Sequence, residues 1–277
     1  MKKLTLNAPA KINIGLNIVS KREDGFHNLE TFFYPIYDLH DVLIFERCDN
    51  FIFDSDNSDL IKDPNNLVIR AHTLLEELVK RKLPIHIQLL KNIPIGAGLG
   101  GGSSDAAATL VGLNEFFELN IKLEKLNELA LQLGSDVPFF IKSKPAIGYS
   151  RGEILKQTQT EINKPILIVN PGIHISTKEA FVHIAPKENK FDYKYFQTVE
   201  EPDYNYLQKN ISNDFEEFVF NKYPEIKEIK DKMIDAGALF CAMSGTGSTV
   251  YGVFDDDDKL KTILTELPLN YFSFVSK

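Results

Sequence analysis

The chain has 277 residues, of which 43% are hydrophobic and 25% charged, and its formal net charge is −8 at pH 7. This composition predicts a globular protein with a buried core, and the length suits two domains of ordinary size. The acidic balance argues against a nucleic-acid-binding surface, and the lack of a long apolar run argues against a membrane span. No apolar stretch follows the N-terminal basic residues, so a signal peptide is not expected. Cys48 and Cys241 are far apart and have no metal-like spacing, so we expect both to be reduced in a cytoplasmic protein.

Strands and helices alternate irregularly through the first half of the chain. Alternating or continuous apolar residues predict strands over 4–19, 32–36, 42–47, 51–54 and 85–90. Apolar residues at helical spacing predict helices over 67–78, 106–117 and 123–133.

The chain turns polar over 151–164, and there we place the boundary between domains 1–155 and 156–277. The second half predicts strands over 166–170, 239–243 and 249–254, helices over 177–184 and 224–236, and a polar loop over 186–203. The four acids Asp255–Asp258 are interpreted as a solvated turn whose last Asp caps a helix from Lys259, with a cation site as the alternative. This irregular order favours the α+β class.

The most informative segment is 94–104, Pro-Ile-Gly-Ala-Gly-Leu-Gly-Gly-Gly-Ser-Ser, which holds five of the 16 glycines. Glycine allows positive φ and close approach of another molecule to the main chain. The segment leads into a predicted helix, whose first N–H groups lack internal partners and carry partial positive charge. The combination predicts a cradle for an anion, with a nucleotide phosphate as the leading candidate.

Other glycine-rich motifs fit this segment less well. Residues 96–101 match G-x-G-x-x-G, but the helix predicted over 106–117 is followed by a second predicted helix over 123–133, where a dinucleotide fold needs a strand. No Lys follows the glycines as a Walker loop requires, and the His-Arg-Asp element of protein kinases is missing. A glycine-rich turn in which Ser103 or Ser104 only caps the helix remains an alternative.

Two further segments accompany the loop: Ala-Pro-Ala-Lys-Ile-Asn-Ile-Gly at 8–15 and Met-Ser-Gly-Thr-Gly-Ser at 243–248. In this order, the three segments resemble the GHMP superfamily of small-molecule kinases, which includes galactokinase, homoserine kinase, mevalonate kinase and phosphomevalonate kinase. Within it, Lys-Ile-Asn at 11–13, Arg-Glu-Asp-Gly-Phe-His at 22–27 and Gly-Ser-Asp-Val-Pro at 134–138 resemble the 4-diphosphocytidyl-2-C-methyl-D-erythritol kinases.

The resemblance implies an α+β fold of two domains, a ribosomal-protein-S5-like N-terminal domain and a ferredoxin-like C-terminal domain, with the active site in the cleft between them. It also implies that ATP, with Mg²⁺, phosphorylates the 2-hydroxyl of 4-diphosphocytidyl-2-C-methyl-D-erythritol in the non-mevalonate isoprenoid pathway. We expect small-molecule partners only, and a monomer or a weak homodimer. Phosphoryl transfer depends on alignment and charge neutralisation, which suits such a loop.

The resemblance assigns catalysis to Asp136, which would accept or orient the hydroxyl proton, and to Lys11, which would stabilise the developing negative charge. A helix N-cap for Asp136 and a solvated strand-edge lysine for Lys11 are the alternatives. The residues expected to bind ATP lie in the loop and just before it in the chain: Pro94, Gly96, Ala97, Gly98, Leu99, Gly100, Gly101, Gly102, Ser103, Ser104, Asn66 and Lys91. Asn66 could instead cap the following helix, and Lys91 could be an ordinary strand-end lysine.

Recognition of the substrate is expected from Asn13, Phe26, His27 and Phe181. Aromatic rings can stack on a nucleobase while a His reads its edge. Tyr is common in the family where this chain has Phe26, so a hydroxyl contact is missing here, and ordinary packing is the alternative for the rings. Two other functions remain open: a kinase of homoserine or mevalonate type, and a non-catalytic ATP-binding sensor.

Overall fold

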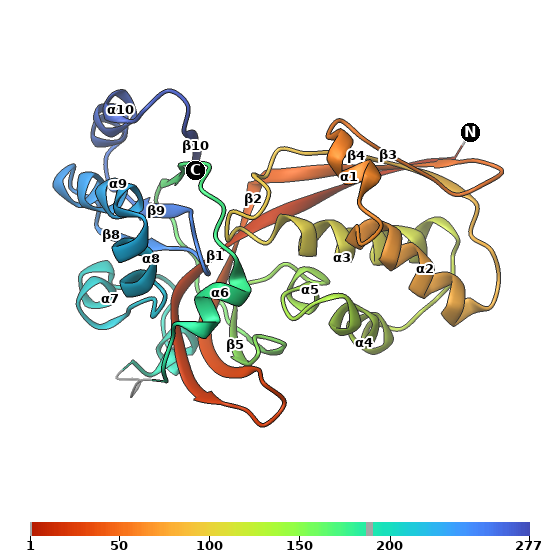
Figure 1. Cartoon of the computed structure of the whole chain (residues 1–277), viewed down its shortest axis with the longest axis horizontal. Coiled ribbons are helices and arrows are strands. Elements are labelled where there is room, and N and C mark those ends of the chain that lie inside the picture. Colours follow the sequence, from red (N-terminus) through yellow and green to blue (C-terminus); the bar gives the residue numbers. More distant parts are fainter. Residues whose placement is uncertain (1, 187–190) are drawn as a thin grey trace. The chain divides into compact units, whose positions relative to one another are not determined.

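The computed structural model describes residues 2–186 and 191–277. They form two compact units that interleave along the chain (Figure 1). The first unit comprises residues up to Ala10, Leu39–Ile95 and Gly100–Ser143, and the second comprises Lys11–Asp38, Gly96–Leu99 and Lys144–Lys277. The predicted boundary at residues 155 and 156 stays a prediction.

Two long strands, β1 (Lys3–Lys21) and β2 (His27–Arg47), contribute residues to both units. In the first unit, β2 pairs antiparallel with β4 (Ile85–Leu90), from Val42 opposite Leu90 to Arg47 opposite Ile85. A short strand, β3 (Ile52–Ser55), runs parallel to β4.

The helices of the first unit are α1 (Ser58–Lys62), α2 (Leu67–Val79), α3 (Gly101–Phe116), α4 (Leu123–Leu133) and α5 (Val137–Phe140). Helix α3 is their centre, because α2, α4 and α5 all pack against it (Figure 1). It lies on the sheet so closely that a Cβ at Gly112 would be 2.5 Å from the ring of Phe45. Helix α3 is therefore packed tightly within this unit.

In the second unit, β2 pairs with β5 (Ala146–Ser150), which pairs with β6 (Ile154–Gln157). A separate antiparallel sheet has the order β10-β7-β9-β8, formed by β7 (Ile166–Asn170), β8 (Phe240–Met243), β9 (Val250–Val253) and β10 (Phe272–Ser276). Helices separate β7 from β8 and β9 from β10. This β-α-β-β-α-β order is ferredoxin-like, as expected.

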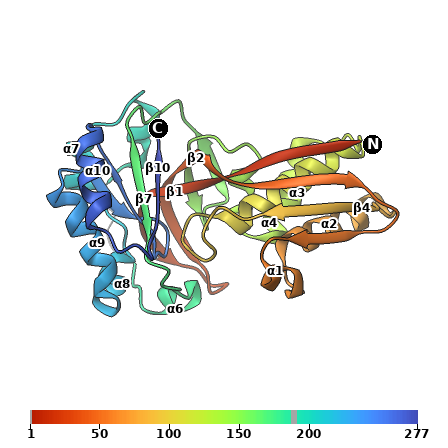
Figure 2. The ribbon, with the colours of Figure 1, turned by 90° about the horizontal axis from the view of Figure 1, so that it is seen from above.

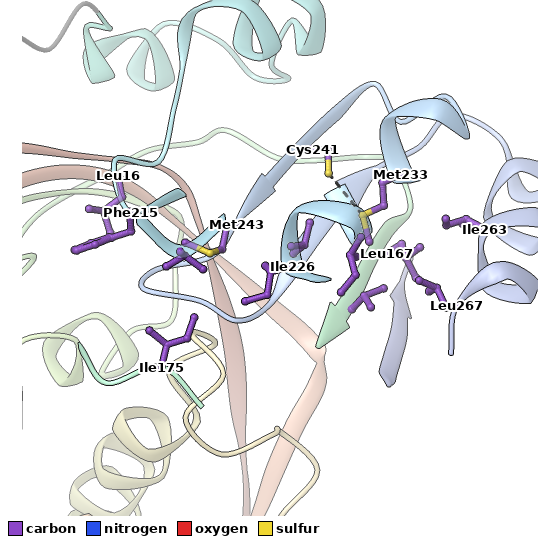
Figure 3. Close-up of a cluster of buried hydrophobic side chains, with 14 of the residues drawn as sticks. Leu16, Leu167, Ile175, Phe215, Ile226, Met233, Cys241, Met243, Ile263 and Leu267 are labelled. Carbon is purple, nitrogen blue, oxygen red and sulfur yellow. Dashed lines mark hydrogen bonds between the residues drawn. The ribbon is translucent and has the colours of Figure 1, made fainter. Parts of the chain in front are cut away.

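The remaining elements are α6 (Thr177–Val182), the 3₁₀ helix η1 (Tyr193–Gln197), α7 (Tyr204–Asn210), α8 (Glu216–Lys222), α9 (Pro224–Asp235) and α10 (Asp257–Glu266). Figure 2 shows α9 and α10 beside the four-stranded sheet. Ile226 and Met233 of α9 and Ile263 of α10 are buried against Leu167 of β7 and form the core of this unit (Figure 3).

The structure corrects several predicted boundaries. The strands expected at 32–36 and 42–47 are one strand, β2, because only the exposed pair Tyr37 and Asp38 interrupts its buried pattern. Helix α3 begins five residues before the predicted 106 and includes two glycines of the motif.

The acidic run also differs from its prediction. The cap of α10 is Asp256, whose side chain accepts a hydrogen bond from the Asp258 main-chain N at 2.7 Å, so the prediction that the last Asp caps a helix from Lys259 is wrong. No cluster of three metal-ligating side chains occurs among the described residues.

The loop predicted over 186–203 contains η1, whose Tyr193 and Phe196 are buried. Residues 187–190 of that loop lie outside the described residues. Within 2–186 and 191–277, none of the helices combines the length and apolar character that crossing a bilayer requires.

Candidate active site

The glycine-rich loop connects β4 to α3 and has an alternating backbone. Gly96, Gly98 and Gly100 have φ values of +68°, +79° and +74°, and the residues between them do not have positive φ. Alternation of left-handed and other backbone conformations turns successive N–H groups toward one concave side, which can bind an anion. Helix α3 then starts at Gly101 and adds its own unpaired N–H groups.

Lys11 and Ser244 hold the first half of this loop through its carbonyl oxygens. Lys11 donates from its main-chain N to Leu99 O at 2.9 Å and from Nζ to Gly98 O at 3.1 Å. The Ser244 hydroxyl donates to the same Gly98 oxygen at 2.9 Å. With these carbonyls engaged, N–H groups are what this stretch of main chain offers to an anion.

The loop also passes very close to the segment 243–248. A Cβ at Gly98 would lie 2.2 Å from Ser244 O and 3.0 Å from Gly247 O. No side chain fits in that space, and φ at Gly98 also disfavours any residue other than glycine. Glycine at 98 is therefore required by sterics and by backbone conformation together.

Lys11 is a buried lysine at the loop, with 3% of its surface exposed. Its ammonium group also contacts Asn13 Oδ1 and lies 5.6 Å from the centre of the Phe33 ring. Asn13 is held in turn, since its Nδ2 donates to Thr31 Oγ1 at 2.9 Å. The alternative of a solvated strand-edge lysine is wrong.

Asp136 immediately precedes α5 and is partly exposed. It occupies the N-cap position of that helix, but within the described parts of the chain its side chain makes no capping hydrogen bond to it. Asp136 belongs to the first compact unit and Lys11 to the second. Their cooperation at one reaction centre stays a prediction.

The start of α3 is capped by no side chain among the described residues, because the cap position is Gly100. The alternative in which Ser103 or Ser104 merely caps the helix is therefore wrong. Ser104 is 1% exposed, and its Oγ has no hydrogen-bond partner within the residues that the structure describes. A buried hydroxyl without a partner costs about 1–3 kcal/mol.

Lys91 is neither exposed nor an ordinary strand-end lysine. Its ammonium group lies between the buried carboxylates of Asp41 and Asp105, 2.8 Å from Asp105 Oδ2. Burial alone would lower the pKa of Lys91, but the two carboxylates outweigh burial and raise it. Burial raises the pKa of Asp105 to about 7, against the attraction of Lys91.

Asn66 is the N-cap of α2. Its Oδ1 accepts a hydrogen bond from Val68 N at 2.8 Å, and its Nδ2 donates to Leu60 O at 3.2 Å. The capping alternative is confirmed. A contact of Asn66 or Lys91 with adenosine stays a prediction.

His27 and Phe181, far apart in the sequence, lie face to face. Their ring centres are 5.1 Å apart with an interplanar angle of 24°, and Phe181 meets the Phe215 ring edge-on. Burial and then the charge of Lys21 lower the pKa of His27, so its imidazole is neutral at pH 7. A neutral imidazole has one donor and one acceptor, which suits it to reading a base edge.

Phe26 is 50% exposed at the turn between β1 and β2. One face of its ring carries the guanidinium group of Arg151, whose central carbon is 4.7 Å from the ring centre. The side chains that we define as the base region are Phe26, His27, Phe181 and Arg151.

Comparison with known proteins agrees with this geometry. The model of the GHMP kinases N terminal domain matches residues 66–144, and that of the GHMP kinases C terminal domain matches residues 195–272. Proteins named 4-diphosphocytidyl-2-C-methyl-D-erythritol kinase are similar throughout: that of Bacteroides fragilis is 42% identical over 91% of this chain and 92% of its own length. The one from Caldanaerobacter subterraneus is 38% identical over 93% of this chain and 90% of its own length. The chain belongs to the 4-diphosphocytidyl-2-C-methyl-D-erythritol kinase family.

Solved structures agree with that assignment. A crystal structure of a 4-(cytidine 5'-diphospho)-2C-methyl-D-erythritol kinase has a TM-score of 0.79, with 30% identity over 98% of both chains. A homoserine kinase from Cytophaga hutchinsonii has a TM-score of 0.78 at 18% identity, over 100% of this chain and 95% of its own, which shows a shared fold alone. The chain is thus a small-molecule kinase of the α+β GHMP architecture.

For this member of the 4-diphosphocytidyl-2-C-methyl-D-erythritol kinase family, sequence reasoning missed three supporting residues. Ser244 was part of a recognised motif, but its contact with Gly98 O was not predicted. Asp41 and Arg151 lie outside the motifs that carried the resemblance, and their partners Lys91 and Phe26 are distant in sequence. Nothing local in the sequence marks either of them.

Proposed function

We propose that this chain transfers the γ-phosphoryl group of ATP to the 2-hydroxyl of 4-diphosphocytidyl-2-C-methyl-D-erythritol, giving the 2-phosphate and ADP in the non-mevalonate isoprenoid pathway. The supporting observation is the loop whose carbonyls are fixed by Lys11 and Ser244, in a chain whose relatives carry that kinase name. The same loop without the family would support only a nucleotide-binding site.

In this proposal, the triphosphate of ATP is held by main-chain N–H groups of Gly96–Ser104 and by the start of α3. Mg²⁺ would be held mainly by the triphosphate and by water, because it sheds water reluctantly. When bound, Mg²⁺ neutralises charge on the transferred group.

The acceptor oxygen attacks the γ-phosphorus while the bond from that phosphorus to the β–γ bridging oxygen breaks, and ADP leaves. Asp136 accepts the hydroxyl proton or orients the hydroxyl, and Lys11 stabilises the negative charge that develops. Asn13 holds the Lys11 ammonium group and is itself fixed by Thr31. Positioning of this kind provides most of the catalysis in phosphoryl transfer.

The cytosine of the substrate stacks on the exposed ring of Phe26 and contacts Phe181, while neutral His27 reads its hydrogen-bonding edge. A base–aromatic stacking contact contributes about 1–3 kcal/mol. Because Phe26 lacks a hydroxyl, stacking and the His27 hydrogen bond provide the recognition.

An ADP-release assay tests the proposal, with ATP and one acceptor at a time: the cytidylated substrate, homoserine, mevalonate or none. We expect steady turnover with the cytidylated substrate, and rates at the no-acceptor level with the other two. Turnover with homoserine or mevalonate instead would assign the chain to a sister kinase. ATP binding without turnover on any acceptor would indicate a sensor.

A further inference from the structure

The contact between Arg151 and Phe26 joins two turns of the second unit. Phe26 lies in the turn between β1 and β2, and Arg151 lies in the turn between β5 and β6. The guanidinium carbon is 4.7 Å from the ring centre, so one of the two ring faces is covered. Phe26 is half exposed, which leaves part of its ring surface available to a ligand.

A chain of hydrogen bonds fixes the two turns to each other. Arg22 Nη1 donates to Ser150 Oγ at 3.0 Å, and Ser150 Oγ donates to Glu153 Oε1 at 3.1 Å. The other oxygen of Glu153 accepts a hydrogen bond from the Arg151 main-chain N at 2.7 Å. Arg151 is therefore attached to the turn that carries Phe26 by a route that does not involve the ring.

The charges of this cluster are matched. Arg151 Nε lies 3.6 Å from Glu153 Oε1, and Arg22 Nη2 lies 2.8 Å from Asp24 Oδ2. Two guanidinium groups beside two carboxylates leave no excess positive charge to attract a phosphate. The contact with the Phe26 ring is then the distinctive interaction of Arg151.

We propose that Arg151 is a positioning residue for the substrate base: it holds one face of Phe26 so that the base stacks on the opposite face. This inference rests on the proposed role of Phe26. A ring fixed in advance loses less rotamer freedom when the base binds than an unsupported exposed ring does. Loss of the support is expected to raise KM for the cytidylated substrate about three- to tenfold.

The test compares Arg151→Ala, Arg151→Lys and Lys156→Ala in steady-state assays of the full chain. Lys156 is a matched control, because its Nζ lies 5.4 Å from the Tyr149 ring in the same β5–β6 hairpin. We expect Arg151→Ala to raise KM for the cytidylated substrate while kcat and KM for ATP change by less than about twofold. Arg151→Lys keeps the charge and should restore part of the lost affinity, and Lys156→Ala should behave as wild type.

Two outcomes of these assays contradict the proposal. One is an unchanged KM for the cytidylated substrate in Arg151→Ala. The other is a fall in kcat together with equal rises in KM for the cytidylated substrate and for ATP, which would indicate a structural role. Thermal unfolding identifies a variant that fails to fold. If Arg151→Ala fails to fold, Arg151→Lys tests the proposal, because it should still have a higher KM for the cytidylated substrate than the wild type.

A double-mutant cycle with Phe26→Ala separates this inference from the proposed function. If Arg151 acts through the ring, adding Arg151→Ala to Phe26→Ala should not raise KM further. A further rise would show direct contact of Arg151 with the substrate and overturn the positioning role. If Phe26→Ala alone leaves KM unchanged, the proposed role of Phe26 fails as well. If only Arg151→Ala is without effect, the inference fails alone.

Discussion

The glycine loop and the base region recognise ligands by different means. The loop offers main-chain N–H groups, and neighbouring hydrogen bonds such as those from Lys11 and Ser244 fix its carbonyls. The base region offers side-chain rings, with Phe26 half exposed and His27 stacked on Phe181. A backbone cradle is set by glycine spacing in one stretch of sequence, whereas a ring cluster depends on segments that meet only in the folded chain.

The largest expected effect is on kcat, and it comes from a change at the proposed catalytic residue Asp136. Asp136→Asn should lower kcat about 10²–10⁴-fold with little change in either KM, because an amide cannot accept the hydroxyl proton. Saturating steady-state kinetics measure it, with Asp235→Asn at the end of α9 as an exposed control. Near-normal kcat would remove Asp136 from the mechanism.

The second-largest expected effect is a fall in kcat/KM when the shape of the glycine loop is changed. Gly98→Ala places a Cβ 2.2 Å from Ser244 O, so the loop must shift, and a shift of about 1 Å in a reacting group can cost about 10²-fold in kcat/KM. Gly172→Ala is the matched control, because Gly172 has φ +77° but no atom within 4 Å of its Cβ position. Equal kcat/KM for the two variants would show that backbone strain alone matters.

A smaller effect on kcat/KM is expected when the base region must distinguish cytosine from uracil. Replacing cytosine by uracil in the acceptor exchanges donor and acceptor at the edge that His27 reads. We expect kcat/KM to fall about ten- to a hundredfold, as for one or two hydrogen bonds left unpaired. Competition of the two acceptors for limiting enzyme measures the ratio directly. Equal use of both would discard the base-reading role.

The smallest expected effect is on stability, and it comes from the ion cluster of Lys91, Asp41 and Asp105 near the start of α3. The folded-state pKa of Asp105 is raised to about 7, so its contribution to stability is present below about pH 4 and is lost as pH rises through 7. Asp105→Asn should therefore flatten the pH dependence and raise the free energy of unfolding at pH 8 by about 1–3 kcal/mol.

Urea unfolding at pH 5 and pH 8 measures this difference. Asp41→Asn serves as the contrast, because Asp41 Oδ1 accepts hydrogen bonds from the Asn92 and Ile93 main-chain N at 2.6 and 2.8 Å and its other oxygen contacts Lys91. That variant should be less stable at both pH values. A uniform loss for Asp105→Asn would contradict the expected sign.

Much of the loop could be predicted from sequence because its causes are local. Glycine spacing predicted the positive φ values, and β4 and β7 begin and end where predicted. The family motifs indicated Lys11, although its burial beside Gly98 depends on the fold. Local patterns fail where an interruption is ambiguous, as at Tyr37 and Asp38 within β2.

The supporting residues could not be predicted, since their partners are far away in the chain. Asp41 and Lys91 are brought together by the pairing of β2 with β4. Arg151 reaches Phe26 because β5 pairs with β2. Neither contact has a signature within a short window, so each requires the three-dimensional pairing of strands.

Because each compact unit is made of segments separated in sequence, no single cut in the chain separates the two units. A cut after residue 155 would separate Lys11–Asp38 and Gly96–Leu99 from residues 156–277, although all of them belong to one compact unit. Each fragment would then retain apolar strand surface whose natural covering had been removed. Halves expressed separately should aggregate or remain unstructured until they are recombined, whereas co-expression should restore a working kinase.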